Sequence, residues 1–157
     1  MNTNHLPRVW DDDIDEWDED CRIYKGEYFT GIAYLTYDNG QIESEGLYIE
    51  GLPEGSHKDW YENGQMKKES IFTRNCGSLL SREWYENGQI KNEVQCLYGF
   101  IQEEKEWDEN GILTFKTVHD LTENTLAAIT RRRERYRKSR LEFYKKYNLG
   151  VVPLILP

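Results

Sequence analysis

One short phrase recurs four times along the chain and constrains the fold more than any other feature of the sequence. Three copies, starting at Tyr37, Tyr61 and Tyr85, read Tyr-Asp/Glu-Asn-Gly-Gln, and a weaker fourth copy starts at Asp108. The glycines of successive copies are 24, 24 and 23 residues apart. A fixed period in this range is typical of repeat proteins, in which each unit packs against its neighbours.

The Asn-Gly pair inside each phrase predicts a β-hairpin. A two-residue type I′ turn needs positive φ at both central positions, and these two residues tolerate it best. We therefore predict a mainly β fold: an elongated antiparallel sheet of hairpin repeats over residues 22–118. An acidic leader (1–21) precedes it, and a C-terminal amphipathic α-helix with an apolar tail (119–157) completes the same single domain. Such a sheet offers a long surface and no obvious pocket.

The predicted turn fixes the register of each hairpin. A two-residue turn at Asn63-Gly64 sets Tyr61 opposite Met66 and Trp60 opposite Lys67. The same count predicts further pairs, namely Asp59 with Lys68, Lys58 with Glu69, Tyr85 with Ile90, Trp84 with Lys91, Arg82 with Glu93 and Trp107 with Thr114. One face then collects tyrosines and apolar residues and is the expected core face: Tyr37, Ile42, Tyr48, Tyr61, Met66, Phe72, Tyr85, Ile90, Val94 and Cys96. The other face carries tryptophans beside lysines.

The repeated segments resemble a known family. Trp60–Lys67 and Trp84–Lys91 read Trp-Tyr-Glu-Asn-Gly-Gln-Met/Ile-Lys, and Tyr24–Gly31 reads Tyr-x-Gly-x-x-x-x-Gly. These segments resemble the MORN repeat and, more closely, its bacterial variant in YwqK-type antitoxins. The resemblance covers about residues 22–115. It implies a binding protein without defined catalytic residues, either a membrane-associated scaffold or an antitoxin or immunity protein that neutralises a bacterial toxin by binding it.

Charge is distributed unevenly along the chain. The whole sequence has a net charge of −9, but residues 122–148 contain nine Lys and Arg against three Asp and Glu, a balance of +6. The remainder therefore carries −15. A body this acidic attracts basic partners and repels nucleic acid and anionic lipid.

All acidic residues of the leader lie in one run over residues 11–20. Its eight carboxylates are Asp11, Asp12, Asp13, Asp15, Glu16, Asp18, Glu19 and Asp20, and Ile14 and Trp17 interrupt them. One interpretation is a solvated, disordered leader. The other is a mimic of a nucleic-acid backbone, in which Ile14 and Trp17 anchor the run in a basic cleft. A calcium loop is disfavoured because Glu16 and Arg22 stand where such a loop needs Gly and Glu.

A helix is expected from Thr122, which can cap its first turn. Its basic stretch, residues 131–140, has two interpretations. It lies against the acidic body of its own chain, or it binds RNA or lipid phosphates. The apolar tail Val151–Pro157 is expected to cover the end or an edge of the sheet.

No pattern of catalytic or metal-binding residues is present. His5, His57 and His119 stand alone and are expected at the surface, and no metal or cofactor is predicted. The cysteines (Cys21, Cys76 and Cys96) form no Cys-x-x-Cys motif, and no secretory signal or membrane-spanning run is visible, so a cytoplasmic location is expected.

These observations together predict a non-enzymatic antitoxin or immunity protein that occludes the active site of a basic toxin, such as a nuclease. The expected toxin-binding residues are the acidic run with Trp17, together with Trp60, Trp84 and Trp107. Neither nucleic acid nor membrane is expected as a partner, and the chain is expected to be a monomer or a weak homodimer through its sheet edges. The alternatives are a membrane-associated scaffold that uses the basic helix and an RNA-binding protein.

Overall fold

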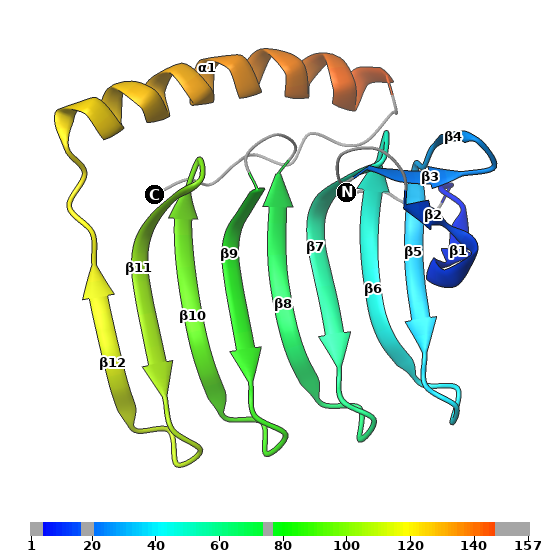
Figure 1. Ribbon diagram of the computed structural model, residues 1–157, viewed down its shortest axis with the longest axis horizontal. Coiled ribbons are helices and arrows are strands. Elements are labelled where there is room, and N and C mark those ends of the chain that lie inside the picture. Colours follow the sequence, from blue (N-terminus) through cyan, green and yellow to red (C-terminus); the bar gives the residue numbers. More distant parts are fainter. Residues whose placement is uncertain (1–4, 17–20, 74–76, 147–157) are drawn as a thin grey trace.

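A computed structural model of the 157-residue chain describes residues 5–16, 21–73 and 77–146. Within these ranges, nine strands form one main sheet, which Figure 1 shows beneath a single long helix. The main sheet consists, in spatial order, of β1 (Arg8–Trp10), β5 (Gly31–Thr36), β6 (Ile42–Ile49), β7 (Leu52–Trp60), β8 (Met66–Thr73), β9 (Gly77–Trp84), β10 (Ile90–Leu97), β11 (Phe100–Trp107) and β12 (Leu113–Val118). The smaller elements are η1 (Asp11–Asp13) and a minor sheet of β2 (Asp15–Glu16), β3 (Arg22–Tyr24) and β4 (Glu27–Tyr28). The helix α1 spans Glu123–Lys146, so the predicted fold class is confirmed.

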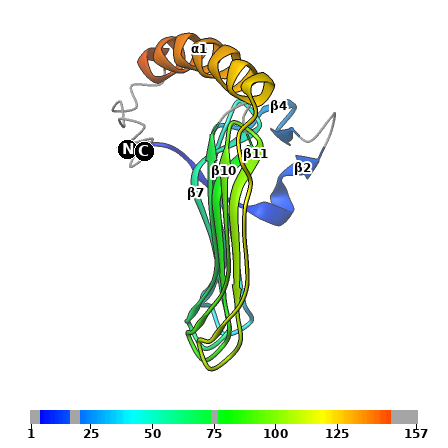
Figure 2. The same cartoon turned by 90° about the vertical axis from the view of Figure 1, so that its left-hand side faces the viewer.

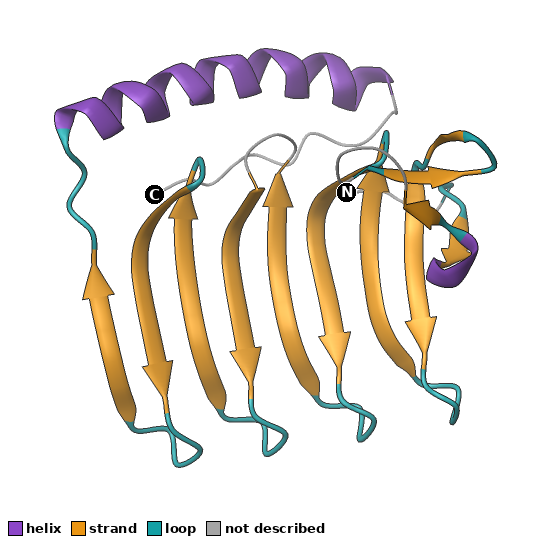
Figure 3. Cartoon of the chain, in the orientation of Figure 1, coloured by secondary structure: helices purple, strands orange, loops and turns teal. Residues whose placement is uncertain are grey.

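The main sheet is one layer thick over most of its width, as the edge-on view in Figure 2 shows. β1 pairs with β5 in parallel, and the other neighbouring strands of the sheet are antiparallel. The Asn-Gly turns all lie at the same end of the strands (Figure 3).

The turns differ from the predicted two-residue type. The amide of Gly64 donates to the carbonyl of Tyr61 at 2.8 Å, and the amide of Tyr61 donates to the carbonyl of Gln65 at 2.8 Å. Gly64 has a φ of 83°, whereas Asn63 is absent from the positive-φ residues. The turn is therefore a three-residue loop in which only the glycine is left-handed. The physical reason is the Asn63 side chain, whose Oδ1 accepts the Gln65 amide at 2.9 Å and holds an Asx turn.

The extra loop residue changes the register next to each turn and a bulge then restores it. Trp60 pairs with Met66 instead of Lys67, and Lys67 is left as the additional residue. Trp84 likewise pairs with Ile90. For the same reason, the predicted cross-strand partners of Tyr61, Tyr85 and Trp107 are wrong. The predicted pairs beyond the bulge, which are Asp59 with Lys68, Lys58 with Glu69 and Arg82 with Glu93, are confirmed.

The register also corrects the predicted core face. A one-residue shift moves a side chain to the opposite face, so Ile42, Met66 and Ile90 lie with the tryptophans and not with the tyrosines. The lysine ammonium groups instead lie over tyrosine rings, Lys67 over Tyr61 at 5.8 Å and Lys91 over Tyr85 at 5.7 Å. We name the two sides the Trp face (Trp60, Trp84 and Trp107) and the Tyr face (Tyr37, Tyr61 and Tyr85). All six of these side chains are only half-buried, so the Tyr face is not the core.

The buried core lies instead at the margins of the sheet. At the N-terminal side, the leader and β4 region cover the Tyr face with a cluster of Val9, Ile14, Phe29 and Ala33. Leu47 and Ile49 form a second cluster with Leu6 and Ile32. The third cluster joins the sheet to the helix and consists of Tyr98 and Ile129, with Leu97, Phe100 and Leu121 packed against them.

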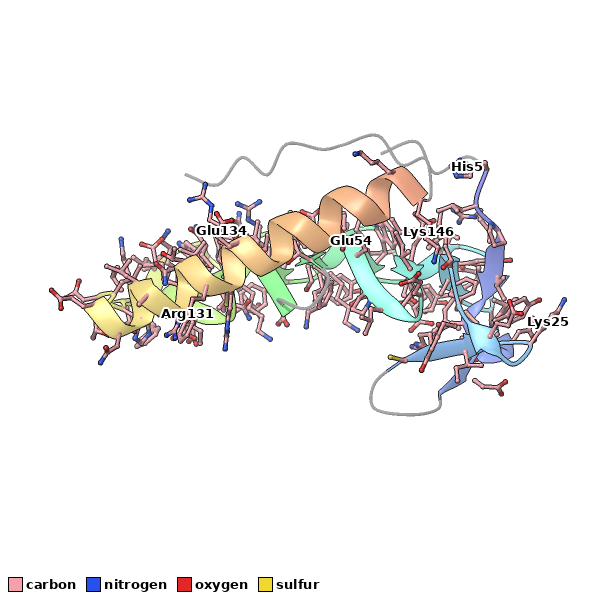
Figure 4. The ribbon with its side chains drawn as sticks, turned by 90° about the horizontal axis from the view of Figure 1, so that it is seen from above. His5, Lys25, Glu54, Arg131, Glu134 and Lys146 are labelled. Carbon is pink, nitrogen blue, oxygen red and sulfur yellow. The ribbon has the colours of Figure 1, made fainter. Side chains whose placement is uncertain are left out.

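The helix α1 runs across the strand ends opposite the Asn-Gly turns (Figure 1), and Figure 4 shows it from above with Lys146 near one end. Thr122 caps it as predicted, because its Oγ1 accepts the Thr125 amide at 3.2 Å. Arg132 donates to the carbonyl of Tyr98, and Lys146 pairs with Glu50 at 2.6 Å. The helix thus contacts its own chain, but at the ends of the strands and not on a face of the sheet. The apolar tail lies outside the described residues.

Candidate interaction surface

Hydrogen bonds between successive repeats set the positions of the Trp-face residues. The hydroxyl of Tyr37 donates to the backbone carbonyl of Trp60 at 2.6 Å, and Tyr61 donates to that of Trp84 at 2.7 Å. Tyr85 makes the same bond to Trp107 at 2.9 Å. The tyrosine of each repeat therefore fixes the backbone of the tryptophan that ends the first strand of the next hairpin. These bonds are not among the features predicted from the sequence, although the recurring Tyr and the Trp that follows it 23 or 22 residues later indicate them.

A row of directly opposed charged residues crosses the Trp face. One residue comes from each strand between β6 and β12, and we name the set the charge row: Glu45, Lys58, Glu69, Arg82, Glu93, Lys105 and Lys116. The sign alternates from Glu45 to Lys105. Opposite charges on neighbouring strands stabilise a sheet, so the row helps to hold the single layer together.

Glu93 lies at the centre of the strongest part of the charge row. Its carboxylate accepts from Arg82 at 2.6 Å, lies 3.6 Å from the Lys105 ammonium and accepts from the Gln95 amide at 2.9 Å. Burial is the largest single influence and opposes ionisation of this group, but the hydrogen bonds from Arg82 and Gln95 and the charges of Arg82 and Lys105 together outweigh it, so the pKa of Glu93 is lowered. The row is largely self-neutralised and leaves little net charge for a partner.

The tryptophans stand beside this row at regular intervals. Because side chains alternate along a strand, Trp60, Trp84 and Trp107 share a face with the cation two residues earlier on the same strand, which is Lys58, Arg82 or Lys105 respectively. They occupy alternate strands, β7, β9 and β11, so about 9.6 Å separates successive tryptophans. The result is a flat, periodic surface of indole rings and ion pairs.

The structure does not bring the acidic leader together with the tryptophans. Trp10 pairs with Tyr34 on the Trp face, whereas Val9 pairs with Ala33, and Ile14 packs on those residues from the Tyr-face side. Asp11 forms an ion pair with Arg22 at 3.2 Å. Ile14 and Asp11 therefore lie toward the Tyr face, whereas Trp10, whose Nε1 donates to Asp12 at 3.2 Å, lies on the same face as the three tryptophans.

Ile14 is 6% exposed and packs within its own chain, so its predicted use as an anchor for a partner is wrong. Asp12, Asp13 and Asp15 are exposed. Glu16 lies in β2, and nothing further is described of its side chain. The predicted site residues Trp17, Asp18, Glu19 and Asp20 lie outside the described residues.

A polar cleft of about 210 Å³ opens on the Tyr face beside the leader. Asp11, Arg22, Tyr48, His57 and Asp59 contribute to its lining. Contrary to the expectation of a surface histidine, His57 is largely buried between the rings of Tyr48 and Phe72, at 4.9 and 4.8 Å. Its Nε2 lies 2.8 Å from the carbonyl of Leu47.

Partial burial has the largest effect on the pKa values of two half-buried groups in this cleft, His57 and Asp59. Desolvation lowers the pKa of His57, and the nearby Arg22 acts in the same direction, while the hydrogen bond to Leu47 opposes both. Desolvation raises the pKa of Asp59, against the effect of Lys68 and Lys67. Among the described residues, no group of three His, Cys, Asp or Glu side chains is placed to hold a metal ion.

Comparisons with known proteins agree with the repeat architecture. A family model described as "MORN repeat variant" matches residues 29–50, 53–73 and 79–95. The three matched segments coincide with successive hairpin repeats of the sheet, which supports a MORN-repeat protein. A comparison with curated proteins finds no match.

One solved structure, "Crystal structure of GtfA/B complex bound to UDP and GlcNAc", is similar over 91% of this chain at 10% identity, with a TM-score of 0.32. The chain spans only 29% of the length of that chain. In the part of the chain that the structure describes, no helix is long and apolar enough to cross a membrane.

Proposed function

We propose that this MORN-repeat protein is a non-enzymatic scaffold that binds a basic protein, and that it acts as an antitoxin or immunity protein by occluding the active site of a basic toxin such as a nuclease. The observation that carries the proposal is the Trp face. Three half-buried tryptophans recur there at a fixed interval, and an inter-repeat hydrogen bond from a tyrosine holds the backbone carbonyl of each one in place. Tryptophan is among the residues that contribute most to protein–protein binding, particularly where the surface is rigid.

The shape of the surface favours a protein over a small molecule. A small ligand requires a concave site that buries most of its surface, whereas the Trp face is one side of a single-layered sheet. The charge row is nearly neutral, so affinity at this face depends on the indole rings and on shape. The ion pairs contribute specificity, because a partner with a wrongly placed charge would leave one of them desolvated and unpaired.

The wider charge distribution favours a basic partner. Outside residues 122–148 the chain carries −15. Exposed carboxylates occur in each Asn-Gly turn, at Asp38, Glu62, Glu86 and Glu109. Such a field accelerates encounter with a cationic surface and repels the phosphates of a nucleic-acid substrate. A bound scaffold would thus both cover a nuclease cleft and exclude its substrate.

Co-expression tests the proposal. The probe is the product of the gene immediately upstream of the one that encodes this chain, expressed as its C-terminal domain. We expect that domain to arrest growth and this chain to restore it. A variant with Trp60, Trp84 and Trp107 all changed to Ser should fail to restore growth, whereas Tyr28→Ser, at a 56%-exposed aromatic outside the Trp face, should restore it fully. Both variants must first show cooperative unfolding by circular dichroism.

Rescue by the folded triple variant would show that the Trp face is not the binding surface, and absence of any arrest or rescue would exclude the antitoxin role.

A second candidate function, a membrane-associated scaffold, rests on the exposed Arg131 and Arg133 of α1. It predicts co-sedimentation with vesicles that contain phosphatidylserine, and loss of that binding in the double variant Arg131→Glu and Arg133→Glu. Salt-sensitive retention of RNA by the same arginines would indicate an RNA-binding protein instead.

A further inference from the structure

The two outer edges of the main sheet differ in how well they are protected. At one edge, β1 has three residues, follows Pro7 and leads directly into η1. At the other edge, β12 has six residues, and nothing in the described part of the chain pairs with its outer side. Short strands and proline protect an edge against further pairing, so only the β12 edge is open in this sense.

Backbone hydrogen bonds show which groups of β12 face outward. The amide of His119 donates to the carbonyl of Gln102 on β11 at 2.9 Å, which sets the phase of the ladder. Because alternate residues of an antiparallel strand point their amides to opposite sides, Thr117 and Phe115 face β11, and Lys116 and Val118 face outward. The outward amides and carbonyls of Lys116 and Val118 are therefore available to another strand.

The side chains of this edge are unusually apolar for an exposed strand. Exposed fractions are 62% for Ile112, 48% for Leu113, 47% for Phe115 and 60% for Val118. Lys116 is the one charged residue of the strand, and it pairs with Glu103 of the same chain at 2.9 Å. A strand with exposed apolar side chains and an unpaired edge is a template for strand addition.

We propose that the β12 edge is a homodimerisation surface, on which β12 of a second copy pairs antiparallel to continue the sheet. The sequence is self-complementary about Phe115. A two-fold axis there sets the two Phe115 rings opposite each other and places each Lys116 opposite Thr114 of the second copy. An axis at Lys116 would instead oppose two lysines, which is unfavourable.

The symmetry of this contact predicts a dimer and not a fibre. The same surface is used by both copies, so a two-fold pair consumes both open edges and leaves the two protected β1 edges outermost. Directly opposed residues of paired strands lie on the same face, so the two Trp faces become one continuous surface. The strands are short, and the buried area falls below the roughly 1,200 Å² typical of stable complexes, so the dimer is weak, with a dissociation constant in the micromolar range or above.

Sedimentation velocity on the full chain from about 5 to 500 μM tests the proposal, a range chosen to span weak association. We expect a concentration-dependent shift from monomer to dimer. Lys116→Pro removes an outward amide that has no ladder bond within the described part of the chain, so it should raise the dissociation constant at least about tenfold without unfolding the sheet. Lys116→Ala removes the same lysine but keeps the amide, and should dimerise like the parent.

A second pair of variants guards against misfolding of the proline variant. Phe115→Glu opposes two carboxylates at the axis and should abolish the dimer, whereas Tyr28→Glu, at an exposed aromatic of β4, should not. Equal dimerisation of the parent, Lys116→Pro and Phe115→Glu would overturn the proposal, as would open-ended polymers. A parent that stays monomeric while a chain ending at Lys146 dimerises would also overturn it, because the tail would then be the occupant of the edge.

Discussion

The hydroxyl of Tyr61 donates a 2.7 Å hydrogen bond to the backbone carbonyl of Trp84, in the next repeat. Both residues are half-buried, and no other described helix or strand covers the sheet at this position. Neighbouring repeats are therefore joined by a side chain that reaches across a strand as well as by the ladder itself. In a one-layered sheet, such bonds take over part of the role that a hydrophobic core has elsewhere.

The tyrosine bond is tested by Tyr61→Phe, which removes the hydroxyl and keeps the ring. We expect a loss of about 0.5–1.5 kcal/mol in the free energy of unfolding, the usual net contribution of one hydrogen bond. Urea denaturation followed by tryptophan fluorescence measures it. Tyr34→Phe serves as a control, because no hydrogen bond from its hydroxyl is among the described contacts and its ring packs against Trp10. Equal losses in the two variants would contradict a structural role for the Tyr61 bond.

The attachment of α1 depends on a single buried side chain at its N-terminal half. Ile129 is 7% exposed and packs on Tyr98, whereas Leu126, one turn earlier, is 47% exposed. We expect Ile129→Ala to cost about 2–4 kcal/mol and Leu126→Ala less than about 0.5 kcal/mol. Thermal melts of both variants measure the difference. A cost at Leu126 as large as at Ile129 would mean that Leu126 also packs against the sheet.

Gly64 acts through backbone conformation alone. Gly64 has a φ of 83°, and no atom lies within 4 Å of the position of an added Cβ. Gly64→Val should therefore cost about 1–2 kcal/mol through strain, and Gly64→Asn clearly less, because asparagine adopts the left-handed region more readily. Chemical denaturation of the pair separates strain from crowding. Similar losses in the two variants would indicate that the side chain clashes with something in the folded protein.

The buried His57 should make stability fall in mild acid. Its pKa in the folded state lies below the unfolded value of 6.5, so the unfolded chain binds the proton more readily. The stability that neutral His57 allows is fully present above pH 6.5 and is lost as the pH falls through the folded pKa. We expect the melting temperature of the parent to drop more between pH 7.5 and pH 5.5 than that of His57→Gln, which retains a donor for the Leu47 carbonyl. An equal drop in the two proteins would show that protonation of His57 does not cause the loss of stability.

Local sequence signals predicted the hairpins but not the details that depend on distant contacts. The Asn63-Gly64 pair identified a turn correctly, yet the type of the turn depended on whether the Asn63 side chain would bond to the Gln65 amide. That choice moved Met66 to the opposite face. His57 has no sequence neighbours that mark it as buried, because Tyr48 and Phe72 come from adjacent strands. Ile14 was read as a free anchor because its burial depends on Phe29 and Ala33, which reach it only through the tertiary fold.

The leader supplies the last prediction, which separates a structural from a binding role for its carboxylates. Asp11 pairs with Arg22 at 3.2 Å, with both side chains about one-fifth exposed, whereas Asp13 is exposed. We expect Asp11→Asn to lower the free energy of unfolding by about 1 kcal/mol, because it leaves the Arg22 charge less well compensated, and Asp13→Asn to have no measurable effect. Urea denaturation at constant ionic strength measures both. A comparable loss at Asp13 would mean that it too is held within the chain, whereas a neutral result leaves the exposed Asp13 available to a basic partner.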